Sequence, residues 1–173
     1  MEALPFWKVV TMDESGFLER LLALLRECGI RYCVVGGQAV NAFVEPLVSL
    51  DLDLALATGE VERLERELTP PFRVERFPHR LNVALPGSDL RVQVQLDRRY
   101  EEFPERAEER EVLGKLLPVA GLEDVLQGKI WAASDSTRRP SKRQKDLADI
   151  ARLLEAYPHL RERVPADLLA RLL

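Results

Sequence analysis

Hydrophobic and polar residues change their spacing several times along the first half of the chain. Apolar side chains recur at helical spacing from Phe17 to Leu25, and this segment ends at Gly29, a common residue just beyond a helix. Residues 31–35 are short, apolar and β-branched, so they predict a buried strand. Residues 38–44 predict a short helix that ends before Pro46.

Residues 50–57 alternate strictly between two kinds of position. The leucines at 50, 52, 54 and 56 point one way, and Asp51, Asp53, Ala55 and Ala57 point the other way. A helix is then expected over residues 60–68, followed by strands over 72–77, 81–85 and 90–97. This order predicts an α/β (α+β) fold with a mixed, mostly antiparallel sheet flanked by helices.

Beyond Tyr100 the pattern becomes helical and charged. The acidic residues of 101–111 are interpreted as a solvated helix face, and an apolar run at 115–119 precedes expected helices over 123–133 and 142–157. We therefore divide the chain into an α/β core, residues 1–112, and a C-terminal helical part, residues 113–173, which packs on the core as one compact domain.

Charge is distributed unevenly along this chain of 173 residues, although the net charge is only -4. That value argues against a protein that coats DNA stably through a uniformly basic surface. Residues 45–70 hold seven acids and two bases, whereas residues 126–145 hold six bases and one acid. No apolar run has the length of a membrane span and no signal peptide is recognisable, so we expect a cytoplasmic protein without a membrane partner.

Asp51 and Asp53 are the most informative pair of residues. Aspartate is depleted in strands, and two aspartates at i and i+2 project from the same face, with Cα atoms about 7 Å apart. Their like charges repel unless a cation lies between them, and oxygen ligands suit Mg²⁺. The alternative is an ordinary solvent-facing strand, which more often carries Lys, Thr or Glu.

Gly36 and Gly37 directly follow the predicted strand and open a helix. Glycine allows a ligand to approach the backbone closely, and the free N–H groups of a helix N-terminus favour phosphate. Glycine is also common at any strand-to-helix turn, so this feature alone would not indicate a binding site.

Together the two features resemble the nucleotidyltransferase superfamily that includes DNA polymerase β. The resemblance is carried by VVGGQAVNAFVEPLVSLDLDLAL, Val34–Leu56, in which thirteen residues separate Gly37 from Asp51. It implies that Asp51 and Asp53 are catalytic and bind Mg²⁺ or Mn²⁺. It also implies that Gly36, Gly37 and Ser49 bind the phosphates of a nucleoside triphosphate.

The second half of the chain resembles the C-terminal helices of small nucleotidyltransferases related to abortive-infection type IV toxins. The matching residues are Lys129, Lys145 and Asp146, with Asp149 three positions later. The resemblance implies that Lys129 and Lys145 bind nucleotide. The alternative is that these residues form salt bridges between two packed helices, and for Asp146 and Asp149 this is at least as well supported.

One position departs from the superfamily pattern. Its members usually supply a third carboxylate from a later strand, which here places Gln93 or Gln95 at that position, with Asp97 further along the same face. An amide oxygen can bind a metal but cannot act as a general base. Three alternatives therefore stay open: catalysis tolerates a glutamine at this position, Asp97 substitutes for the acid, or the site binds nucleotide without turning it over.

The function predicted from these residues is metal-dependent transfer of a nucleoside monophosphate from an NTP to a hydroxyl on an RNA end, a protein or a small molecule. The alternatives are a catalytically degenerate nucleotide-binding protein of the same fold and an interaction protein with a toxin–antitoxin partner. The basic run at 138–145 could hold phosphates, although Arg138 and Arg139 are interpreted as part of a solvated, mobile loop.

Overall fold

A seven-stranded sheet with the order β3-β4-β5-β2-β1-β7-β6 forms the centre of the molecule. The structure is a computed structural model and describes residues 16–172. Strands β1 and β7 pair in parallel, as do β2 and β5, whereas the other four neighbouring pairs are antiparallel. The strands are β1 (Tyr32–Val35), β2 (Asp51–Leu56), β3 (Arg73–Phe77), β4 (Arg80–Ala84), β5 (Arg91–Gln95), β6 (Glu108–Val112) and β7 (Lys115–Val119).

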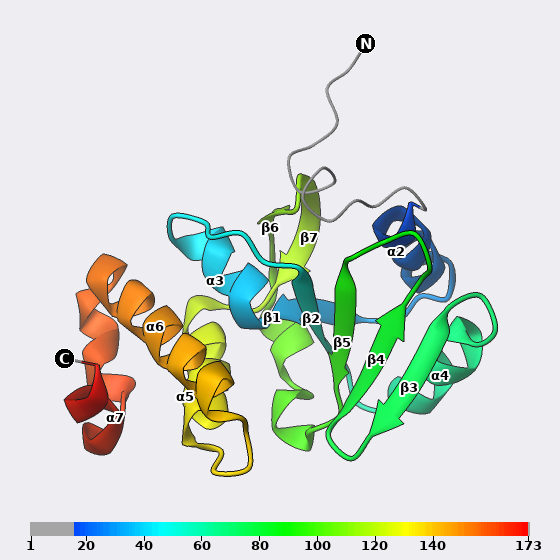
Figure 1. Ribbon diagram of the computed structural model, residues 1–173. Coiled ribbons are helices and arrows are strands. Elements are labelled where there is room, and N and C mark those ends of the chain that lie inside the picture. Colours follow the sequence, from blue (N-terminus) through cyan, green and yellow to red (C-terminus); the bar gives the residue numbers. More distant parts are fainter. Residues whose placement is uncertain (1–15, 173) are drawn as a thin grey trace.

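Helices lie around this sheet (Figure 1). Helices α2 and α4 lie on one side of it, and α5, α6 and α7 form a group beside α3 at the left of the view. The α-helices are α2 (Phe17–Glu27), α3 (Gly36–Phe43), α4 (Val61–Leu68), α5 (Leu122–Ser134), α6 (Pro140–Ala156) and α7 (Ala166–Arg171). Three 3₁₀ turns complete the described chain: η1 (Arg98–Tyr100), η2 (Phe103–Arg106) and η3 (Pro158–Arg163).

The alternating pattern of β2 explains how the sheet separates core from site. Leu52 and Leu54 are fully buried, in one hydrophobic cluster with Leu21 of α2 and Leu64 of α4. Because side chains alternate along a strand, this burial fixes the opposite face for the acids of β2. The predicted fold class, a mixed and mostly antiparallel sheet flanked by helices, is confirmed.

The expected helix face over Glu101–Glu111 was wrong. These residues form η2 and most of β6, an edge strand that pairs antiparallel with β7. The turn between the two strands has Leu113 and Gly114 at φ values of 52° and 76°. Two positive φ values in a two-residue loop are typical of a tight hairpin. Gly114 therefore indicated a turn, but the charge pattern of the preceding residues was interpreted as a helix.

The expected boundary between core and C-terminal part falls within this hairpin, between β6 and β7. Strand β7 also pairs with β1, so the central sheet includes residues on both sides of position 112. The division into two parts stays a prediction. Among residues 16–172, no helix has the length and apolar character needed to cross a membrane.

Candidate functional site

The glycine turn and the acidic strand meet at one point of the structure. Gly36 has a φ of 70°, in the left-handed region, at the junction of β1 and α3. A Cβ atom at this position would lie 3.0 Å from Cγ of Asp53 and would overlap its carboxylate. Glycine therefore provides both the backbone conformation and the space that the Asp53 carboxylate occupies.

Asp51 lies at the first position of β2 and is surrounded by polar groups. Its backbone N–H donates to Ser49 Oγ at 3.2 Å, so Ser49 fixes the entry to the strand. Arg91 Nε lies 2.8 Å from Asp51 Oδ1, and Lys142 Nζ lies 3.7 Å from Oδ2. Two cations from β5 and α6 thus face the first acid of the pair.

Asp53 is electrostatically different from Asp51. Its Oδ1 atom is shielded from solvent and has no hydrogen-bond partner within the part of the chain that the structure describes. Burial raises the pKa of Asp53 from 3.8 to about 6, and repulsion from Asp51 adds to this, whereas attraction to Lys129 opposes it. A shielded carboxylate oxygen without a partner costs stability, and such groups are concentrated at functional sites.

The acid pair fits a divalent cation. Mg²⁺ is commonly held by one or two carboxylates together with substrate phosphates, and the unpartnered Oδ1 of Asp53 is an oxygen donor of the required kind. Within residues 16–172, no group of three or more His, Cys, Asp or Glu side chains could hold a metal. Mg²⁺ sites of this kind usually take their remaining ligands from water and from substrate phosphates.

The third acid was expected at Gln93 or Gln95, and these two residues have different neighbours on β2. Strands β2 and β5 run in parallel with Asp53 opposite Gln93, and Ala55 opposite Gln95. Gln93 is thus the direct neighbour of the acid pair, and Gln95 is one step further from it.

Asp97 lies beyond the end of β5, four residues past Gln93, and the structure does not bring it to the acid pair. Its carboxylate caps η1 by accepting the Arg99 backbone N–H at 2.9 Å, and it also accepts Arg99 Nη2 at 2.7 Å. The hydrogen bond from Arg99 lowers the pKa of Asp97. The carboxylate of Asp97 is therefore bound by Arg99 at the end of β5.

Lys129 is buried between α5 and α6, with 6% of its surface exposed. Its Nζ atom lies 3.1 Å from Asp146 Oδ1 and 2.8 Å from Asp149 Oδ2. Burial alone would lower the pKa of Lys129, but the two carboxylates, Asp149 first, outweigh it and raise that pKa. Both acids make the interhelical salt bridges considered from the sequence, and the charge of Lys129 also acts on Asp53.

Lys145 and Lys142 of α6 differ in exposure and in their contacts. Lys145 is exposed, and no contact joins it to the acid pair in the described residues, whereas Lys142 faces Asp51. Lys142 shares its face with Asp146 and Asp149, because residues four and seven positions apart align on a helix. That spacing could have identified Lys142 from the sequence.

The interpretation of Arg138 as a solvated loop residue was wrong. Arg138 Nε donates to Asp146 Oδ2 at 2.7 Å, and its side chain is only partly exposed. The acceptor, Asp146, is a fully buried carboxylate that needs more than one hydrogen-bond donor. This need explains why Arg138 of the loop contacts it. Arg139 is exposed.

Arg152 and Arg91 were also missed by sequence reasoning. Arg152 Nη1 donates to Asp149 Oδ1 at 2.9 Å, and Arg91 reaches Asp51 across the parallel pairing of β2 and β5. The contact of Arg91 depends on strand register, which the sequence does not reveal. The spacing of three between Asp149 and Arg152 was a visible signal for a helical ion pair.

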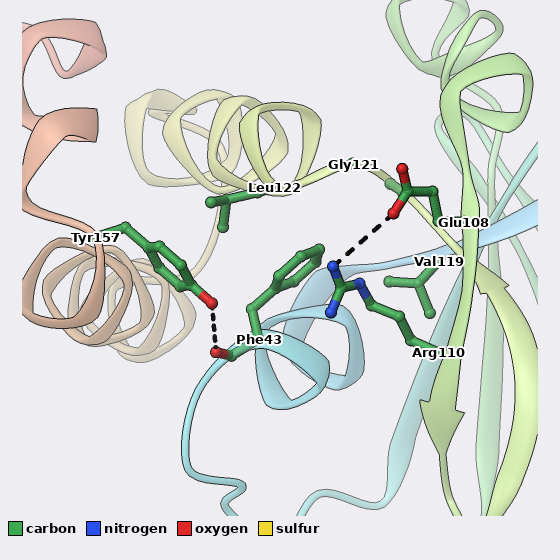
Figure 2. Close-up of a pocket in the computed structure, with 8 residues that line it drawn as sticks. Phe43, Glu108, Arg110, Val119, Gly121, Leu122 and Tyr157 are labelled. Atoms are coloured by element: carbon green, nitrogen blue, oxygen red, sulfur yellow. Dashed lines mark hydrogen bonds and ion pairs between the residues drawn. The ribbon is translucent and has the colours of Figure 1, made fainter.

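A separate hollow of about 270 Å³ lies between α3, β6 and the neighbouring ends of α5 and α6. Figure 2 shows Phe43 and Arg110 facing one another in it, with the guanidinium carbon 4.0 Å from the ring centre. Tyr157 closes one side by donating from its hydroxyl to Phe43 O at 3.0 Å. None of the site residues predicted from the sequence lines this hollow.

Several solved structures are similar to this one. The crystal structure of ANT(2″)-Ia in complex with adenylyl-2″-tobramycin has a TM-score of 0.63 and 18% identity, covering 90% of this chain and 97% of that one. The lincomycin-bound lincosamide antibiotic adenylyltransferase LnuA has a TM-score of 0.52 and 13% identity over 83% and 99% of the two chains.

A nucleotidyltransferase-like antigenic protein from Paracoccidioides brasiliensis has a TM-score of 0.52 and 19% identity, covering 94% of this chain and 93% of that one. At these identities the likenesses show the fold, which is that of nucleotidyltransferases.

Sequence comparison adds the family. Among curated proteins, none matches this chain significantly. Residues 36–173 match the family described as nucleotidyl transferase AbiEii toxin, type IV TA system. This match begins at the glycine turn and includes β2 and every later element of the structure. Because it covers well over half of the chain, the protein belongs to the AbiEii family of nucleotidyl transferase toxins from type IV toxin–antitoxin systems.

Proposed function

We propose that the protein transfers a nucleoside monophosphate from an NTP to a hydroxyl acceptor in a reaction that requires Mg²⁺ or Mn²⁺. The observation that carries this proposal is the contact between Asp53 and Gly36. It brings an acid pair and a helix N-terminus together, with a buried carboxylate oxygen that lacks a partner. Acids attract metal and helix N-termini attract phosphate, so one nucleotide could engage both.

In this proposal each residue has a separate role. Asp51 and Asp53 hold the cation, and Gly36 and Gly37 let the phosphates approach the start of α3. Ser49 orients Asp51 through the backbone N–H of that residue. Lys142 and Arg91, which now pair with Asp51, would turn toward the phosphates as negative charge arrives there.

The cation supplies Lewis-acid activation of the phosphoryl group and charge neutralisation of the leaving pyrophosphate. Asp53 has a raised pKa, so it must lose its proton before it binds metal well. Lys129 helps here, because its positive charge favours the ionised form of Asp53. The roles of Lys129 and Lys145 in binding nucleotide directly stay predictions.

A second candidate rests on Gln93. An amide opposite Asp53 cannot accept the proton of an attacking hydroxyl, so the same fold could bind nucleotide without turning it over. In a toxin–antitoxin system such a protein would act by sequestering nucleotide or by binding its partner. Turnover in the presence of metal separates the two candidates.

The experiment is incubation of the purified protein with each α-labelled NTP, Mg²⁺ or Mn²⁺ and a cell extract. Transfer of label to RNA, protein or a small molecule supports the enzyme and identifies the acceptor. The matched control is Asp51→Asn, which should abolish labelling without removing buried apolar surface. If no NTP labels any acceptor with either metal, the proposed transfer reaction is wrong.

A further inference from the structure

The loop between α3 and β2, residues 44–50, leads directly into the acid pair. It contains no helix or strand, and its Leu47 and Val48 side chains are 60% and 65% exposed. Loops of this kind usually move more than the elements that they connect. Because Asp51 follows immediately, the position of this loop determines where the first metal-binding carboxylate lies.

Two amide side chains of α3 hold this loop from one side. Gln38 Nε2 donates to Ser49 O at 3.1 Å. Asn41 makes two bonds to Leu47, donating from Nδ2 to the carbonyl at 2.7 Å and accepting the backbone N–H on Oδ1 at 3.0 Å. The loop is thus attached to the helix that carries the glycine turn.

Arg152 holds the same loop from α6. Its Nη2 atom donates to Glu45 O at 2.6 Å and to Asn41 Oδ1 at 3.0 Å, while Nη1 donates to Asp149 Oδ1 at 2.9 Å. Its side chain is 18% exposed. A planar guanidinium can serve three acceptors in different directions, which the compact ammonium group of lysine cannot do with the same geometry.

Arg152 is also the end of a chain of alternating charges. Ion pairs link Arg138 to Asp146, Asp146 to Lys129, Lys129 to Asp149, and Asp149 to Arg152. Lys129 acts electrostatically on Asp53, and Arg152 contacts the loop that precedes Asp51. Helices α5 and α6 therefore act on the two acids together: Lys129 of α5 acts on Asp53 through its charge, and Arg152 of α6 acts on Asp51 through the loop.

From these contacts we infer that Arg152 is a positioning residue for the acid pair: it fixes loop 44–50 against α6 and so sets where Asp51 meets the cation and the nucleotide. This inference rests on the proposed function for its effect on nucleotide. Its effect on the loop does not depend on that function.

The test compares Arg152→Lys and Arg152→Ala with Arg163→Ala, full-length protein in each case. Arg163 pairs with Glu123 at 2.8 Å on the surface, so its variant controls for loss of an arginine ion pair. Three quantities are measured: hydrogen exchange of the peptide spanning 44–50, the dissociation constant of each Mn²⁺–NTP, and KM and kcat for the NTP where transfer is seen.

We expect Arg152→Lys to keep the ion pair with Asp149 and a melting temperature close to wild type. Exchange of residues 44–50 and the dissociation constant should nevertheless both rise by about tenfold or more, because lysine cannot serve the three acceptors of Arg152 and a misplacement of about 1 Å in a site can cost about 100-fold. KM should rise more than kcat falls. Arg152→Ala should show the same change, and Arg163→Ala should show none.

The inference is overturned if exchange of residues 44–50 stays within about threefold of wild type in Arg152→Lys, or if exchange rises but nucleotide affinity and KM do not change. Should Arg152→Ala fail to fold, the lysine variant decides. Should wild-type protein bind no NTP, the proposed function fails, and the exchange measurement alone still decides whether Arg152 fixes the loop.

Discussion

The carboxylate of Asp53 lies in the space that a side chain at position 36 would occupy. Gly36 has a φ of 70°, and a Cβ atom added there would lie 3.0 Å from Asp53 Cγ. The glycine turn and the acid of β2 are therefore a single structural unit. The family match begins at this same glycine.

Substitution of Gly36 by alanine should disturb this unit in two ways. The left-handed backbone costs about 1–2 kcal/mol for any L-residue, and the new methyl group must also displace Asp53. The matched control is Gly59→Ala, at a φ of 83° with no atom within 4 Å of the added Cβ. Gly36→Ala should lose more stability than Gly59→Ala in chemical denaturation, and it alone should lose binding of Mn²⁺–NTP. Equal losses would contradict the contact.

Asp53 should make stability depend on pH. Its pKa is raised from 3.8 to about 6, so the folded protein holds a proton that the unfolded chain has already released between these values. Stability therefore falls as pH rises from about 4 to about 6. At pH 8 in metal-free buffer, Asp53→Asn should be more stable than wild type by up to about 3 kcal/mol, and the gain should vanish near pH 4. Denaturant midpoints across this range measure the effect.

Asp97 provides a control of opposite sign. Its pKa is lowered, chiefly by the hydrogen bond from Arg99, so its contribution stabilises the fold at neutral pH and is lost as pH falls below the ordinary aspartate value. Asp97→Asn should therefore be less stable than wild type at pH 7, with the gap closing in acid. A gain in stability for Asp97→Asn at neutral pH would refute this assignment of the two aspartates.

Lys129 should be important for stability and Lys145 should not. Loss of the Lys129 ammonium leaves Asp146 and Asp149 buried with fewer cationic partners, so Lys129→Met should cost about 3 kcal/mol. Lys145 is exposed, and Lys145→Met should change the free energy of unfolding by less than about 0.5 kcal/mol. Urea denaturation of both variants measures the difference, and similar costs for both would contradict the salt-bridge role of Lys129.

Gln93 should limit the affinity of the site for metal. In Gln93→Asp a third carboxylate enters opposite Asp53, and the dissociation constant for Mn²⁺ should fall by about tenfold, equivalent to about 1.4 kcal/mol. Gln95→Asp is the matched control, because Gln95 lies opposite Ala55. Isothermal titration with Mn²⁺ alone tests this, and an equal gain in both variants would show that register is not the cause.

Much of the fold could be predicted from spacing alone. The strict alternation of residues 50–57 predicted both the strand and the shared face of Asp51 and Asp53, since burial of the leucines leaves the acids no other side. The β6–β7 hairpin was missed because its edge strand is charged, and charge periodicity does not distinguish a solvated helix from an exposed edge.

The site was less predictable than the fold. The sequence identified the acids and glycines, which are local features, and Lys129, which the structure assigns to an interhelical cluster. Helical spacing relates Lys142 and Arg152 to the acids of α6, but it does not reveal that Lys142 reaches Asp51 or that Arg152 reaches the loop before β2. The contact of Arg91 with Asp51 likewise depends on which strands are neighbours in the sheet. Long-range partners of a site are therefore the part that sequence reasoning misses.

The most direct test of the central claim is isothermal titration of the protein with NTP in the presence and absence of Mg²⁺ or Mn²⁺. Wild-type protein should bind at least one NTP much more tightly with the cation, and the double variant Asp51→Asn, Asp53→Asn should lose this metal-dependent gain while staying folded. Binding that is equally tight in the double variant, or that does not respond to the cation, would contradict the assignment of these two aspartates as the metal-binding acids of a nucleotidyltransferase site.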